Sequence, residues 1–181
     1  MPKLSVILCI DSPLVKELLN GVSLHQLALG EAITFSKANS AEIIEVERSD
    51  LLAQIRNLDT EVIIIHDALR PLVTAAQFQR AYEALDGLDA VRPTMAFTET
   101  IKSLDAEYRL DLTIDREKVR RISSPEVIKR SAIDFDCAIT TWSVPLRNGA
   151  KVGEVEADPE SIRINSAEEL RFLKALTELR K

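Results

Sequence analysis

The sequence predicts an α/β fold in which helices flank a mixed, mostly parallel sheet. Strand-like and helix-like segments alternate along most of the chain, and no repeat or low-complexity tract interrupts them. Residues 61–65 (EVIII) contain a continuous apolar run after Glu61, which is typical of a central parallel strand covered on both faces. With 181 residues, 46% of them hydrophobic and 29% charged, the chain suits one globular domain over residues 1–181.

The individual elements follow from local patterns. Apolar and β-branched runs predict strands at residues 4–10, 42–46, 61–65, 90–97 and 161–164. A hydroxyl residue before a helix-forming run predicts N-caps at Ser12, Ser49, Ser124 and Ser166. Proline follows Ser12 and Ser124, at the first helical position that it favours, and another helix is expected around residues 75–88. The helix after Ser12 is expected to include Leu14, Val15, Leu18 and Leu19, which recur at helical spacing.

Residues 98–124 break this alternation. Apolar residues are interleaved with charged ones there, namely Ile101, Leu110, Leu112, Ile114, Val119 and Ile122. This pattern predicts a protruding antiparallel arm, so we expect one domain with an arm and no linker.

Composition and charge exclude several functional classes. Cys9 and Cys137 have no CxxC partner, which argues against a redox or metal role for either. The apolar runs are too short to cross a bilayer, and the N-terminus does not have the pattern of a signal peptide, so we expect a cytoplasmic protein without membrane contact. A net charge of −6 argues against nonspecific nucleic-acid binding.

An ordered set of short motifs resembles one known family. The stretch 66–71 (HDALRP) follows the buried strand, as HDAARP does in the methylerythritol phosphate cytidylyltransferase family. Other segments are similar to that family's E-R-x-D, D-T-x-K, T-V-D-R, T-P-Q and N-I-K-V, namely 47–50 (ERSD), 99–102 (ETIK), 113–116 (TIDR), 124–126 (SPE) and 161–164 (SIRI). Each match is short, but together they occur in order from about residue 42 to the C-terminus.

The resemblance implies a nucleotidyltransferase-type fold (GT-A-like and Rossmann-like) and a homodimer whose arms reach the partner's site. It implies an isoprenoid-precursor reaction that joins CTP to methylerythritol phosphate with magnesium and releases pyrophosphate. The substrate residues that it implies are Asp67, Arg70, Thr100, Arg116 and Arg163, the last in place of a lysine. Asp67 also stands where the wider superfamily places a magnesium ligand, although one carboxylate holds magnesium poorly without a partner or phosphates.

The part of the chain that would bind the nucleotide, here called the nucleotide half, departs from the family pattern. The family holds the triphosphate on a glycine-rich loop after the first strand, but residues 11–17 here read DSPLVKE and the first glycine is Gly21. Asp11 adds negative charge where a triphosphate would sit, and Pro13 removes an amide donor. Residues 140–144 (TTWSV) also lack the acidic residue of the family's T-D-E-A-S, and Trp142 stands among them.

Two functions therefore remain open, besides a purely structural partner that binds no ligand. In one, the chain is a catalytically impaired dimeric binding or regulatory protein that still accepts a small phosphorylated ligand. In the other, it is a working cytidylyltransferase, or a related transferase of changed specificity, that uses magnesium. Structural explanations also stay open: Asp67 and Arg70 could cap the next helix and pair with each other, His66 could be structural, and Arg116 could pair with acids of a dimer partner.

Overall fold

The computed structural model describes residues 2–139 and 143–178, so the interpretation of Trp142 lies outside the described residues. The main sheet has the strand order β11-β6-β10-β5-β1-β4, and β9 pairs with the carboxyl end of β6. Its strands are β1 (Leu4–Cys9), β4 (Glu42–Val46), β5 (Val62–Asp67), β6 (Ala90–Met95), β9 (Arg121–Ile122), β10 (Glu126–Lys129) and β11 (Val152–Glu156). β1 is parallel to β4 and β5, and β11 is parallel to β6, whereas β10 and β9 run antiparallel to their neighbours. The predicted mixed α/β sheet is confirmed.

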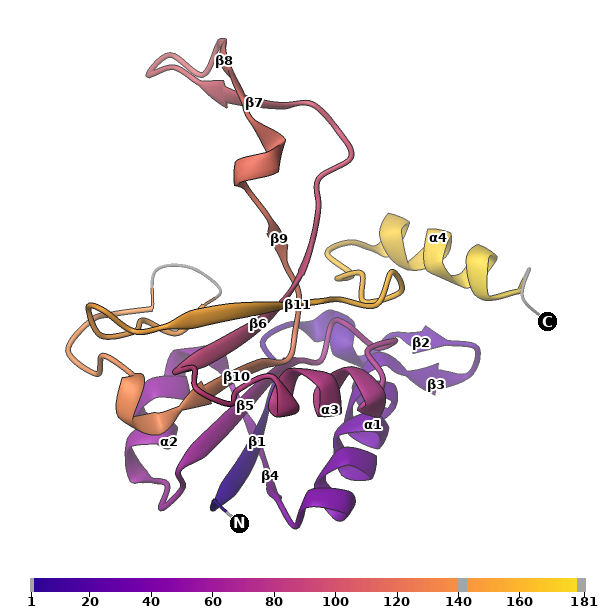
Figure 1. Cartoon of the computed structure of the whole chain (residues 1–181). Helices are drawn as coiled ribbons and strands as arrows, with labels where there is room; N and C mark the ends of the chain where they lie inside the picture. Colours follow the sequence, from indigo (N-terminus) through magenta and orange to yellow (C-terminus); the bar gives the residue numbers. More distant parts are fainter. Residues whose placement is uncertain (1, 140–142, 179–181) are drawn as a thin grey trace.

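Helices cover both faces of the sheet, as Figure 1 shows. The α-helices are α1 (Leu24–Asn39), α2 (Leu51–Asn57), α3 (Ala75–Glu83) and α4 (Ala167–Glu178), and short 3-10 turns are η1 (Pro13–Lys16), η2 (Arg48–Asp50), η3 (Arg116–Lys118) and η4 (Arg130–Ala132). Side chains alternate along β1, so that Val6 packs with Phe35 of α1 and Phe78 of α3, whereas Ile7 packs with Ile55 of α2. No helix in the described part of the chain is long and apolar enough to span a membrane.

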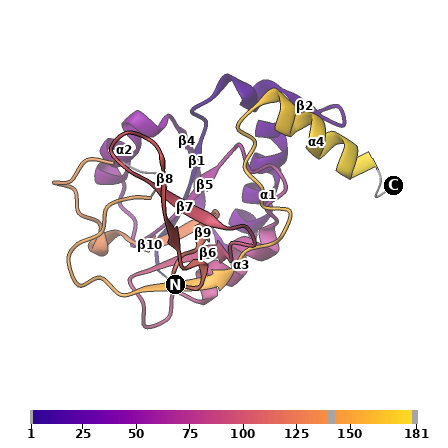
Figure 2. The ribbon, with the colours of Figure 1, turned by 90° about the horizontal axis from the view of Figure 1, so that it is seen from above.

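Two small hairpins lie outside the main sheet. The first joins β2 (Leu18–Leu19) to β3 (Val22–Ser23), and the second joins β7 (Ile101–Leu104) to β8 (Leu110–Ile114). The second hairpin projects far from the sheet, and Figure 2 shows the same arm from above. The expected antiparallel arm over residues 98–124 is therefore present.

Several local expectations are wrong. Leu18 and Leu19 belong to β2 rather than to a helix, because the 3-10 turn that Ser12 caps ends at Lys16. No helix begins at Ser124: residues after Pro125 form β10, because Val127 and Ile128 are buried between β5 and β6.

Two further boundaries differ from expectation. Residues 161–164 do not form the expected strand. They lie beside the loop after β5, where the Ile164 amide donates a hydrogen bond to the Leu69 carbonyl. α2 forms as expected, but its N-cap is Asp50 rather than Ser49, and that side chain makes no capping bond.

Candidate functional site

The predicted site centres on Asp67 at the carboxyl end of β5, the edge where α/β sheets bind ligands. The Asp67 side chain is only 3% exposed, and both of its oxygens are engaged. Oδ1 accepts a hydrogen bond from the amide of Leu69 (3.0 Å), and Oδ2 accepts one from Nε of Arg163 (2.7 Å). Asp67 therefore pairs with Arg163, and Thr74 rather than Asp67 caps α3.

Arg70 lies beside this pair but donates to the protein itself. Its guanidinium bonds to the carbonyls of Ser161 (2.5 Å) and Ile122 (3.1 Å) and to the hydroxyl of Ser123 (3.3 Å). Burial lowers the pKa of Arg70 to about 10, against the opposing effect of the Asp67 carboxylate, so the side chain stays charged at neutral pH. Arg70 thus joins the loop after β5 to the base of the arm and to residue 161.

His66 precedes Asp67 and is completely buried against Phe78, with the ring centroids 4.9 Å apart. Its Nδ1 lies 2.8 Å from the hydroxyl oxygen of Ser124, at the point where the arm returns to the sheet. Burial, and to a smaller extent the charge of Arg70, lowers the pKa of His66 to about 3. The imidazole is therefore neutral at physiological pH, and its contacts are those of a structural residue.

Thr100 and Arg116 belong to the arm and not to this cluster. Arg116 begins η3, where it donates to the carbonyl of Thr98 (2.7 Å) and lies 3.8 Å from Glu117. Thr100 directly precedes β7. Figure 1 shows the arm rising from β6, returning through β9 and projecting away from the sheet. One chain therefore brings Asp67 and Arg163 together with Arg70 beside them, but not the two arm residues.

The segment between β1 and α1 occupies the place of the expected nucleotide loop. Ser12 caps η1, and the amides of Val15 and Glu17 bond to carbonyls within the same turn. The β2–β3 hairpin follows, with Asn20 and Gly21 at positive φ in its turn.

The same segment contacts α4 and the start of η2. Val15 and Leu19 are buried in one apolar cluster with Leu170 and Leu173 of α4. The Asn20 side chain bonds to Thr177 (3.1 Å). Asp11, at the end of β1, accepts a bond from the Arg48 amide.

The residues present do not fit a magnesium ion. Magnesium requires near-octahedral oxygen coordination, and Asp67 supplies one carboxylate whose two oxygens already have partners. Within residues 2–139 and 143–178, no group of three or more His, Cys, Asp or Glu side chains is placed to hold a metal ion. Burial also raises the pKa of the nearby Cys9 thiol to about 12, with a smaller effect of Asp11, so this thiol is protonated at neutral pH.

A buried ion pair near this edge was not singled out from the sequence. Glu126 of β10 is 1% exposed, and its Oε1 lies 2.7 Å from Nε of Arg92 on β6. Its other oxygen accepts a bond from the Val144 amide (3.4 Å). The only available signal was the family's T-P-Q motif, in which an acid here replaces a glutamine.

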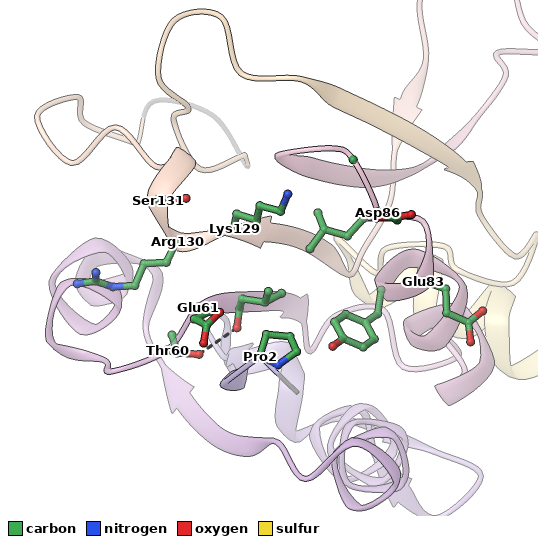
Figure 3. Close-up of a pocket in the computed structure, with 12 residues that line it drawn as sticks. Pro2, Thr60, Glu61, Glu83, Asp86, Lys129, Arg130 and Ser131 are labelled. Atoms are coloured by element: carbon green, nitrogen blue, oxygen red, sulfur yellow. Dashed lines mark hydrogen bonds between the residues drawn. The ribbon is translucent and has the colours of Figure 1, made fainter.

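A large cavity of about 660 Å³ lies at the opposite edge of the sheet (Figure 3). Its lining includes Pro2, Glu61, Tyr82 and Lys129, near the amino end of β5 and the last residue of β10. None of the predicted site residues lines this cavity. The site at the carboxyl edge is therefore defined by its side-chain cluster and not by this cavity.

Comparison with known proteins decides the family. Residues 21–171 match the family model described as IspD, 2-C-methyl-D-erythritol 4-phosphate cytidylyltransferase. The chain belongs to this family. The matched range includes the Asp67 cluster and the arm, but residues 11–20 lie outside it.

Curated relatives of the chain are longer bifunctional enzymes. A bifunctional enzyme IspD/IspF of Nitrobacter hamburgensis is 31% identical over 124 residues, which are 60% of this chain and 30% of that protein. The corresponding enzyme of Rhizorhabdus wittichii is 30% identical over 130 residues, covering 72% of this chain and 32% of the relative. The chain thus spans about a third of the length of the curated relatives that it matches.

Solved structures of cytidylyltransferases share the fold. The 4-diphosphocytidyl-2C-methyl-D-erythritol synthase of Anaerococcus prevotii superposes with a TM-score of 0.79 at 17% identity, covering 98% of this chain and 99% of that one. The 2-C-methyl-D-erythritol 4-phosphate cytidylyltransferase of Thermus thermophilus gives 0.76 at 17% identity, covering 98% and 100% of the two chains. These similarities confirm the nucleotidyltransferase-type fold.

Proposed function

We propose that this chain is a catalytically impaired member of the cytidylyltransferase family, a dimeric binding or regulatory protein that keeps a pocket for a phosphorylated polyol. In this proposal the chain resembles an enzyme of the methylerythritol phosphate route to isoprenoid precursors, but its nucleotide half no longer supports cytidylyl transfer.

The observation that carries this proposal is the closed segment between β1 and α1. A triphosphate is held by backbone amides that point into an open loop, together with basic side chains. Here the amides of Leu14, Val15 and Glu17 donate to Ser12 or to Leu14, and the hairpin that follows pairs with itself. Loss of one positioned donor typically reduces catalysis by about a hundredfold or more, and several are missing together.

The other half supports a phosphorylated ligand. Asp67 and two arginines, Arg70 and Arg163, gather at the carboxyl edge, and arginine matches phosphate geometry well. Thr100 and Arg116 complete the set that the family resemblance implies if the arm of one chain reaches the site of its partner. Arg70 then acts mainly by supporting the pocket, since its Nη1 and Nη2 already bond to carbonyl oxygens.

An active cytidylyltransferase is the second candidate. It is favoured by the family match over residues 21–171, which includes the arm and the whole substrate half. In this case another segment would have to supply the triphosphate contacts that residues 11–17 do not offer.

A calorimetric titration with CTP and magnesium separates the two candidates. The impaired protein should give no heat at millimolar CTP while circular dichroism shows that it is folded. Stoichiometric binding in the micromolar range would contradict the proposal and favour the active enzyme.

Lys16 provides the matched control for this titration. It is the one basic residue within residues 11–17. If CTP binds and Lys16→Ala removes that binding, the 3-10 turn itself holds the nucleotide. If binding survives in Lys16→Ala, the nucleotide contacts come from elsewhere in the protein.

A further inference from the structure

We propose that Arg163 takes the place of a divalent cation at Asp67, so that the carboxyl edge of the sheet binds a phosphate group without magnesium. The part that concerns the cation is independent of the proposed function. The part that concerns the phosphate rests on the phosphorylated-ligand pocket proposed above.

The first argument is the geometry of the carboxylate. Asp67 is 3% exposed, and its two oxygens face Arg163 at 2.7 Å and the Leu69 amide at 3.0 Å. A metal ion would have to displace one of these donors and then find its remaining ligands elsewhere. A guanidinium supplies the same opposite charge and also a directional hydrogen bond.

The second argument is the fixed position of Arg163. Its Nη1 donates to Oδ1 of Asn165, whose own side-chain amide donates to Glu169 in the first turn of α4 (3.0 Å). The backbone beside it is anchored by the Ile164 amide on the Leu69 carbonyl (2.8 Å). The side-chain contact with Asn165 and the backbone contact of Ile164 therefore fix the guanidinium at Asp67.

The third argument is the local charge. Asp67 acts on Arg70 as the opposite charge, whereas Arg163 and Arg121 both lower its pKa as like charges. Arg163 therefore pairs with the Asp67 carboxylate and Arg70 lies close to it, whereas Arg121 lies close to Arg70. Two guanidinium groups beside the Asp67 carboxylate favour a phosphate over a divalent cation at this point, because their positive charge exceeds the negative charge of that carboxylate.

Titration with MnCl₂, followed by amide NMR, tests the replacement of the cation. Bound manganese broadens nearby signals, so the wild-type protein should show no selective loss of the amide signals of residues 66–69 below millimolar manganese. Selective broadening there that Asp67→Asn removes would overturn the proposal. The comparison of wild type with Asp67→Asn is decisive even if substitution of Arg163 prevents folding.

Arg163→Gln provides the converse measurement. If the guanidinium blocks the carboxylate, this variant should gain manganese broadening at residues 66–69, and Arg163→Gln combined with Asp67→Asn should lose it again. No gain in a folded Arg163→Gln protein would count against the idea that Arg163 stands where a cation would bind.

Titration with inorganic phosphate in the presence of EDTA tests the ligand. We expect phosphate to bind with the chelator present and Arg163→Gln to weaken it by tenfold or more. Binding that appears only after magnesium is added would overturn the proposal. Absence of phosphate binding under both conditions would refute the phosphorylated-ligand pocket. The manganese titration would still test separately whether a divalent cation binds at Asp67.

Discussion

Nδ1 of His66 lies 2.8 Å from the hydroxyl of Ser124, which joins the end of the central strand β5 to the point where the arm re-enters the sheet. The Ser124 hydroxyl also lies 3.4 Å from the Asp67 amide. A buried, neutral imidazole therefore sits directly beneath the site, and its protonation is linked to folding.

This linkage predicts a loss of stability in mild acid. The pKa of His66 is about 3 in the folded protein and 6.5 as the reference value, so between these values the unfolded chain binds a proton that the folded chain does not. The free energy of unfolding should fall as the pH drops below 6.5, by about 2 kcal/mol at pH 5. Urea unfolding at pH 7 and pH 5 measures this fall in the free energy of unfolding.

His66→Gln is the control, because it cannot titrate and isolates the histidine from the carboxylates. The variant should lose less stability than the wild type between the two pH values. Equal losses would show that His66 is protonated in the folded protein, contrary to its burial.

Arg70 should contribute more to stability than a surface arginine. Arg70→Met removes the bonds to the carbonyls of Ser161 and Ile122 and leaves the Ser161 carbonyl with only the longer bond from the Ser123 hydroxyl (3.3 Å). We expect a loss of about 3 kcal/mol in urea unfolding and faster hydrogen exchange at the base of the arm.

Arg80 offers a matched comparison on α3. Its ion pair with Asp158 has side-chain exposures of 46% and 23%, so Arg80→Met should cost no more than about 1 kcal/mol. Similar losses for the two variants would contradict a supporting role for Arg70.

Much of the fold was predictable because its signals are local. The apolar run at residues 61–65 indicated β5, and the alternation of charged and apolar residues indicated the arm. The sequence reasoning placed no helix at α1, although Ser23 and Gln26 form a capping box that could have shown it. The Ser-Pro pair before β10 resembled a helix start, but burial of Val127 and Ile128 between two strands decided the outcome.

The site was less predictable because its contacts join distant residues. The family resemblance named Asp67, Arg70 and Arg163, but no local pattern shows that Asp67 pairs with a residue 96 positions away instead of with Arg70. The absence of glycine after β1 indicated an altered loop. That this loop folds as a turn and hairpin against α4 depends on tertiary packing of Val15 and Leu19.

The buried pair of Glu126 and Arg92 yields another prediction. Glu126 is 1% exposed and Arg92 is 20% exposed, so Glu126→Ala should leave a half-buried guanidinium without its partner and cost about 3 kcal/mol. Replacing both residues by methionine should recover much of that loss, because two apolar side chains need no charge partner. If the double variant is as unstable as the sum of the single ones in urea unfolding, the two residues do not interact as a pair.

The arm yields the last prediction, which tests the proposed dimer. Leu104, Tyr108, Leu110 and Leu112 of the β7–β8 hairpin are 53–85% exposed, and a two-stranded hairpin alone is only marginally stable in water. We expect a second chain to cover this surface, so Leu110→Asp with Leu112→Asp should reduce the mass in light scattering from two chains to one. Leu18→Asp, at an equally apolar position that is 50% exposed outside the arm, should leave the mass unchanged. A dimer that persists without these leucines, or a monomeric wild type, would refute the arm as the interface, and Thr100 and Arg116 could then not reach a partner's site.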